Sequence, residues 1–107
     1  MRGDLVAIAM QGDFGKPRPA LVIQADPFEA HASVTVLPVT STLVEAPLLR
    51  VTVVPTSQNG LQKTSQVMID KTLTVKKDKV GYAFGRLEPD TLIEVERCLA
   101  VFLGIAK

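Results

Sequence analysis

The chain has 107 residues, of which 47% are hydrophobic and 21% are charged, which is the size and balance of one domain (1–107) with a core of its own. Lysine and arginine outnumber aspartate and glutamate by only 12 to 11, so the overall charge gives no support for nucleic-acid binding and none against a local basic site. Cys98 is the only cysteine, which excludes an internal disulfide and a cysteine metal cage within one chain. Because no basic N-terminal segment precedes an apolar run, we expect a cytoplasmic protein with no membrane partner.

Short apolar or alternating stretches, bounded by turn-forming residues, predict a series of strands. These stretches are residues 5–10, 20–24, 33–40, 49–53, 66–70, 72–75 and 80–86. Pro38 is expected to mark the point where regular pairing stops, and Arg50 is expected on the solvent face of its strand. Asn59-Gly60 predicts a turn that needs a positive φ, and residues 26–30 predict a turn with one turn of helix.

The pattern changes to helical spacing at Pro89, a residue suited to the first helical position. Five apolar side chains then fall on one stripe: Leu92, Val95, Leu99, Phe102 and Leu103. Gly104 is expected to end the helix. The fold class predicted is therefore mainly β, a small barrel of six or seven strands closed or capped by a C-terminal helix.

Residues 12–19 contain two glycines and an arginine, Arg18, between Pro17 and Pro19. A guanidinium stays charged at working pH and offers a planar fork of donors, so a stiff backbone on both sides is a way of aiming it at an anion. The alternative is a surface loop in which Arg18 is only solvated.

Several kinds of catalytic or binding site are excluded by what the sequence lacks. His31 is the only histidine, which removes a Ser-His-Asp triad, a two-histidine acid-base pair and a histidine metal site, so no metal and no cofactor are expected. The glycine loop lacks the Gly-Lys-Ser/Thr ending of a nucleotide-binding loop and leads into a strand.

Arg18 and a hydroxyl cluster remain as candidate chemistry. If strands 20–24 and 33–40 pair antiparallel, the start of the first lies beside the end of the second, which brings Arg18 to Thr40, Ser41 and Thr42. An arginine beside several hydroxyls can bind a phosphate, and in RNA the substrate's own 2′-hydroxyl can be the attacking group. The alternative is that these hydroxyls only cap the end of a strand.

Ordered motifs over nearly the whole chain resemble the MazF/PemK (Kid) family of toxin endoribonucleases, whose fold is shared with the gyrase poison CcdB. They are Arg-Gly-Asp and apolar residues at 2–6, Arg-Pro and an apolar strand at 18–23, Pro-x-Thr-Ser at 38–41, an apolar strand with Asp and Thr-Val at 67–75, and Gly-Arg-Leu at 85–87 before a helix ending Phe-Leu-Gly-Ile. The resemblance implies an SH3-like barrel with a C-terminal helix.

The resemblance also implies a function and its residues. It implies a homodimeric toxin of a toxin-antitoxin system that cleaves single-stranded RNA at a short sequence, leaving a 2′,3′-cyclic phosphate and a 5′-hydroxyl. The family's catalytic arginine and threonine fall on Arg18 and Thr40, and the aspartate used by Kid-like members falls on Asp70. The implied partner is a cognate antitoxin with an acidic tail.

Contacts to the RNA are predicted from the loop and the strand end. Phe14 is the best candidate for stacking on a base, with packing of the loop as its alternative role, and Asp13, Lys16 and Ser41 are further candidates for substrate binding. Residues 76–79 include lysines that either contact the RNA backbone or belong to a solvated connecting segment. Two other functions remain open: a CcdB-like gyrase poison without nuclease activity, and an RNA-binding relative without catalysis.

Overall fold

The computed structural model describes residues 1–9 and 16–106. Its elements are β1 (Asp4–Ala9), β2 (Pro17–Val22), a 3-10 turn (Asp26–Phe28), β3 (Ser33–Thr40), β4 (Arg50–Val53), β5 (Ser65–Met68), β6 (Leu73–Lys76), a second 3-10 turn (Lys77–Lys79), β7 (Val80–Arg86) and α1 (Pro89–Phe102). The mainly β class with a C-terminal helix is confirmed, as is the turn of helix after residue 25.

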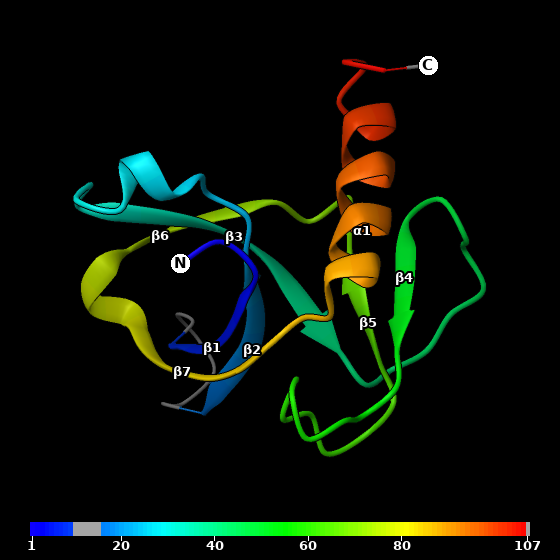
Figure 1. The fold of residues 1–107 in the computed structure, drawn as a ribbon, viewed down its shortest axis with the longest axis horizontal. Helices are drawn as coiled ribbons and strands as arrows, with labels where there is room; N and C mark the ends of the chain where they lie inside the picture. Colours follow the sequence, from blue (N-terminus) through cyan, green and yellow to red (C-terminus); the bar gives the residue numbers. More distant parts are fainter. Residues whose placement is uncertain (10–15, 107) are drawn as a thin grey trace.

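The described strands form one antiparallel sheet in the order β4-β5-β3-β2-β1-β7, with β6 paired to β3 beside this path. Figure 1 shows β1, β2, β3, β6 and β7 curling round one another, while β4 and β5 lie together beside α1. The end strands β4 and β7 do not pair with each other within the described part of the chain, so the sheet curls without closing.

Strand β3 is long because it changes partner along its length. Its first four residues pair with β6, residues 36–38 pair with β2, and its last residues, Val39 and Thr40, pair with Val67 and Gln66 of β5. The expectation that pairing stops at Pro38 is therefore wrong, since Pro38 is itself paired with Ala20. A proline removes one donor, which an alternating antiparallel ladder tolerates where that position makes no bond.

The central strands bury side chains on both faces, which explains why their sequences are apolar without alternation. One cluster faces α1 and contains Leu5, Leu21 and Leu37, which are neighbours across β1, β2 and β3. The other contains Val6, Ile8, Ala20, Val22 and Val36 on the opposite face. Strand β2 thus lies between two cores.

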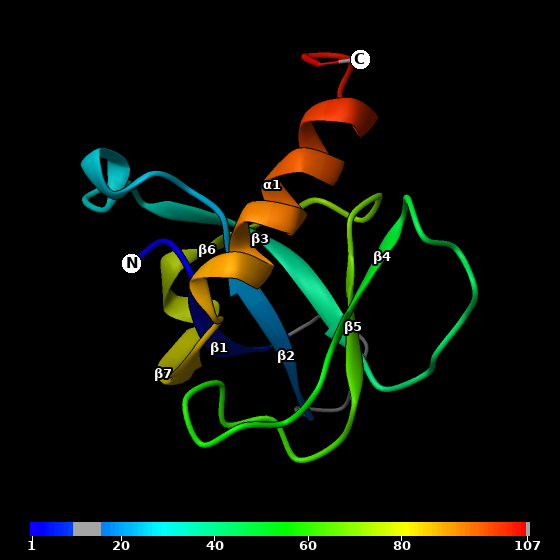
Figure 2. The ribbon, with the colours of Figure 1, turned by 45° about the vertical axis from the view of Figure 1, so that its right-hand side comes forward.

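Helix α1 covers the first cluster and then extends past the sheet. Val95 and Cys98 are buried in it, and Leu92 and Leu99 pack against it, as the helical stripe predicts. Phe102 and Leu103 are exposed, because the last turn rises beyond the sheet, as Figures 1 and 2 show.

Gly104 ends the helix as predicted. Its φ is 76°, and the amides of Gly104 and Ile105 bond to the carbonyls of Val101 and Ala100, the pattern of a Schellman cap. The predicted turn at Asn59-Gly60 also has the expected geometry, since Gly60 has a φ of 69°. No helix among the described residues is long and apolar enough to cross a membrane.

Candidate active site

Strands β2 and β3 bring Arg18 and Thr40 to one end of the sheet. The two strands are antiparallel with Ala20 opposite Pro38, so extending this register by two residues places Arg18 opposite Thr40. Both residues line one groove of about 1020 Å³. The expectation that this pairing brings the arginine to the hydroxyl cluster is confirmed, and Ser41 and Thr42 line the same groove.

Arg18 lies inside β2 and not in the loop before it. The strand begins at Pro17, which corrects the prediction that it begins after Pro19. Pro17 and Pro19 lie opposite Ala9 and Ala7 of β1, and the described pairing of β2 with β3 starts only at residue 20. Because the two prolines are two residues apart, both can occupy non-hydrogen-bonded positions of the β1–β2 ladder, where no amide donor is needed. The ladder therefore stays intact.

The groove carries positive charge. Its basic side chains are Lys16, Arg18, Lys63 and Lys71, and no aspartate or glutamate is among the described residues that line it. A cleft lined by one sign of charge raises the local concentration of the opposite ion. The groove is therefore suited to a polyanion.

The hydroxyl of Thr40 is held in place by its neighbours. Its Oγ1 accepts a hydrogen bond of 3.0 Å from the backbone N–H of Thr42, which leaves the hydroxyl hydrogen to donate to a ligand. Behind it, the buried Gln66 lies opposite Thr40 on β5 and binds both the N–H and the carbonyl of Val44. The strand end that carries Thr40 is thus tied to the loop that follows.

Asp70 is not among the residues that line the groove. Its Oδ1 lies 2.7 Å from Nη1 of Arg50, and the two side chains are only 20% and 15% exposed. The hydrogen bond from Arg50 holds the pKa of Asp70 below its ordinary value, so this carboxyl is ionised at neutral pH. Arg50 lies on the face opposite the buried Val51 and Val53, as predicted, but its guanidinium turns back to this carboxylate and is little exposed.

Asp70 nevertheless reaches the groove through a neighbour. Its Oδ2 lies 3.7 Å from Nζ of Lys71, and Lys71 is one of the four basic residues among the described lining of the groove. The structure therefore brings Arg18, Thr40, Ser41 and Lys16 together, with Asp70 behind Lys71. Asp13 and Phe14 lie outside the described residues.

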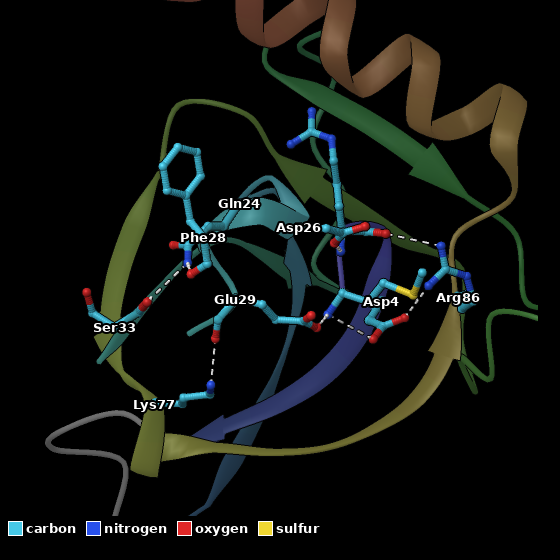
Figure 3. Close-up of polar contacts among 10 residues, drawn as sticks. Asp4, Gln24, Asp26, Phe28, Glu29, Ser33, Lys77 and Arg86 are labelled. Atoms are coloured by element: carbon cyan, nitrogen blue, oxygen red, sulfur yellow. Dashed lines mark hydrogen bonds and ion pairs between the residues drawn. The ribbon is translucent and has the colours of Figure 1, made fainter. Parts of the chain in front are cut away.

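The lysines of residues 76–79 lie elsewhere. Lys77 borders a second, smaller cavity of about 260 Å³ at the other end of β2, lined also by Asp4, Asp26 and Glu29. Figure 3 shows Lys77 pointing to Glu29, whose backbone carbonyl accepts a bond of 2.6 Å from its Nζ. Of the two roles considered for this cluster, the connector role agrees with its place away from the groove.

Sequence reasoning missed two groups of groove residues. Tyr82 and Phe84 of β7 line it, as do Lys63 and Lys71 from the segments before and after β5. Tyr82 and Phe84 are two residues apart, the spacing of one face of a regular strand, but β7 has register shifts against β1. Only the folded arrangement of the strands therefore shows that both line the groove. Within residues 1–9 and 16–106, no three His, Cys, Asp or Glu side chains are grouped so as to hold a metal ion.

Comparison with known proteins assigns the family. Residues 1–103 match the family described as PemK-like, MazF-like toxin of type II toxin-antitoxin system. A probable endoribonuclease MazF from Mycolicibacterium smegmatis (strain ATCC 700084 / mc(2)155) is 47% identical over 106 residues, which cover 98% of this chain and 97% of that protein.

Solved structures agree with this match. An endoribonuclease in complex with its cognate antitoxin, from a mycobacterial species, has a TM-score of 0.84 and 25% identity over 100% of this chain and 97% of that one. A MazE-MazF structure from Deinococcus radiodurans has a TM-score of 0.78 and 27% identity over 98% and 95% of the two chains. With the sheet, the C-terminal helix and the ordered motifs in agreement over nearly its whole length, the chain belongs to the PemK-like, MazF-like toxins of type II toxin-antitoxin systems.

Proposed function

We propose that the chain is an endoribonuclease that cleaves single-stranded RNA in the groove, with Arg18 and Thr40 as its catalytic residues. The observation that carries the proposal is that Arg18 and Thr40 line one groove whose described charged residues are all basic. The antiparallel register of β2 and β3, extended by two residues, supports it by putting the two residues opposite each other. The 47% identical relative named as a probable endoribonuclease MazF supports the same activity.

The chemistry follows from these two side chains. The 2′-hydroxyl of the substrate attacks the adjacent phosphorus, the bond to the 5′-oxygen of the next nucleotide breaks, and the products carry a 2′,3′-cyclic phosphate and a 5′-hydroxyl. Negative charge grows on the non-bridging oxygens in the transition state, and the Arg18 fork neutralises it. The Thr40 hydroxyl donates to the same phosphate and fixes its orientation.

Asp70 has a positioning role in this proposal. Its carboxylate joins Arg50 to Lys71, so its loss changes the place of a groove cation and leaves the Arg18–Thr40 pair intact. Asp70→Asn is therefore expected to raise KM more than it lowers kcat.

The partners proposed follow from the family and from charge. MazF-type neighbours include complexes with MazE and with a cognate antitoxin. We propose that this chain acts as a homodimer in the cytoplasm and is neutralised by a cognate antitoxin whose acidic tail covers the basic groove. The matches to MazF-type toxins do not favour the gyrase-poison alternative.

The test maps RNA ends. Purified protein is incubated with mixed single-stranded RNA in a chelating buffer, and the products are sequenced by a method that captures 2′,3′-cyclic phosphates. Wild type is expected to cut at a short sequence. Arg18→Ala is expected to lose about 100-fold to 1,000-fold in rate, the usual effect of removing one transition-state donor.

Two further variants sharpen the result. Thr40→Val keeps the shape of the side chain and removes the donor, so it tests the hydroxyl itself. Arg97→Ala removes an exposed arginine of α1 that does not line the groove and serves as the matched control. Intact RNA with wild type, or equal cleavage by wild type and Arg18→Ala, contradicts the proposal. Binding without cleavage would instead favour the non-catalytic relative.

A further inference from the structure

Tyr82 is an aromatic side chain turned to solvent in the middle of a strand. It is 81% exposed on β7, while Phe84, two residues on, also lines the groove and is partly buried against the core that faces α1. Phe84 thus holds the strand to the core, and Tyr82 presents a large flat surface with little protein around it. Tyrosine, with an apolar ring and a polar tip, is enriched at binding interfaces.

The position of Tyr82 relative to Arg18 is fixed by the sheet. Strand β1 lies between β2 and β7, and Ile8 of β1 is opposite Arg18 on one side and Val80 on the other. Arg18 and Tyr82 therefore stand on strands about 10 Å apart. Tyr82 lies between Val80 and Ala83, in the stretch where the register of β7 against β1 shifts. Both line the groove, so one ligand of nucleotide size or larger can meet both.

The chemistry of the groove selects among ligands for this ring. An exposed aromatic beside basic side chains, with no acidic residue among the described lining, matches the way proteins hold single-stranded nucleic acid. In that mode cations bind the phosphates and aromatic rings stack on the bases. An apolar protein partner would not account for the concentration of cations.

We propose that Tyr82 stacks on a nucleobase of the RNA strand whose scissile phosphate is held by Arg18. The inference rests on the proposed function and adds to it a substrate-binding residue on β7. The stacked base lies close to the cleavage point, so Tyr82 contributes to the binding and register of the substrate and takes no part in bond breaking.

The composition of the chain gives a direct assay. Tyr82 is the only tyrosine and there is no tryptophan, so the intrinsic tyrosine fluorescence reports this side chain alone. The probe is a single-stranded oligonucleotide of the cleaved sequence with 2′-O-methyl groups, which cannot supply the attacking hydroxyl. Titration of this probe is expected to quench the fluorescence, and replacing the stacked base by an abasic site is expected to abolish most of the quenching.

Variants measure the contribution to binding by the anisotropy of the labelled probe. Tyr82→Ala is expected to weaken binding by about 5-fold to 100-fold, the range measured for one stacked base. Tyr82→Phe keeps the ring and is expected to bind within about twofold of wild type on the same grounds. Phe28→Ala removes another exposed aromatic, outside the groove, and is the matched control.

Failure of this inference is distinguishable from failure of the proposed function. If wild type cleaves RNA but the bound probe leaves the fluorescence unchanged, or Tyr82→Ala binds as tightly as wild type, the stacking role is refuted and the nuclease stands. If Tyr82→Ala changes only the oligomeric state or the affinity for an antitoxin, Tyr82 is a protein contact and the inference is likewise refuted. If wild type neither cleaves nor binds RNA, the proposed function fails and this inference fails with it.

Discussion

The salt dependence of RNA binding tests whether the groove holds the phosphate backbone. Each phosphate neutralised on a single strand contributes a slope of about −0.7 to the logarithm of the binding constant against the logarithm of salt concentration. With Lys16, Arg18, Lys63 and Lys71 each meeting one phosphate, the slope is about −2.8. Affinity then falls about 50-fold between about 50 mM and about 200 mM KCl.

The perturbation is the double variant Lys63→Gln/Lys71→Gln, which removes two groove cations and keeps side chains of similar length. Its slope is expected to be about −1.4, so its affinity falls only about 7-fold over the same range. The assay is the anisotropy of a labelled 2′-O-methyl oligonucleotide at several salt concentrations. The matched control is Lys77→Gln/Lys79→Gln, which removes two lysines outside the groove and should leave the slope at the wild-type value.

Two results would refute this reasoning. A wild-type slope weaker than about −1 would mean that the groove does not neutralise a nucleic-acid backbone. A double variant with the wild-type slope would mean that the strand takes a path away from residues 63 and 71. Loss of slope in the control variant would place the backbone at the other end of the sheet.

Three predictions concern the frame that carries the site. Gly85→Ala should destabilise the fold by about 3 kcal/mol in urea titration, because the new Cβ overlaps the Asn59 carbonyl oxygen, and an unchanged midpoint would contradict the close packing. Asn59→Ala should lower the free energy of unfolding by about 3 kcal/mol in thermal unfolding, because the buried amide bonds to Glu88 and to loop backbone groups that would lose their partner. A loss under about 1 kcal/mol would mean that water replaces the amide. Arg50 lowers the pKa of Asp70, so the ion pair stabilises the fold fully at a pH above the ordinary pKa of 3.8 and loses this effect as the pH falls through the lower pKa of the folded state. The difference in Tm between wild type and Asp70→Asn should therefore disappear at this low pH. A difference that stays constant with pH would exclude the linkage.

The fold was largely predictable because its signals are local. Apolar runs, turn residues and the helical stripe locate the strands and α1, and Gly60 and Gly104 take the conformations that their neighbours indicate. The errors come from tertiary contacts that override local pattern. Pairing continues past Pro38 because Val39 and Thr40 find a partner in β5, and the guanidinium of Arg50 is drawn back from solvent by an aspartate twenty residues away.

The candidate site was predictable only in part, for a related reason. Arg18 and Thr40 lie on consecutive long strands, so an antiparallel pairing suffices to bring them together. Tyr82, Lys63 and Lys71 come from segments whose neighbours depend on the whole strand order, with β1 inserted between β2 and β7. No spacing in the sequence reports that order.

The prolines beside Arg18 act through the register of the sheet. The second half of β2, residues 20–22, is buried on both faces, so a slip by one residue would still place apolar side chains in both cores. The hydrophobic pattern alone therefore specifies the register weakly. Pro17 and Pro19 remove this ambiguity, because a slip by one residue against β1 would move both prolines to positions where the ladder needs a donor. The same slip would turn Arg18 to the other face of the sheet, away from its place opposite Thr40. The residues on either side of the arginine therefore select the one pairing of β1, β2 and β3 in which the phosphate-binding pair is assembled.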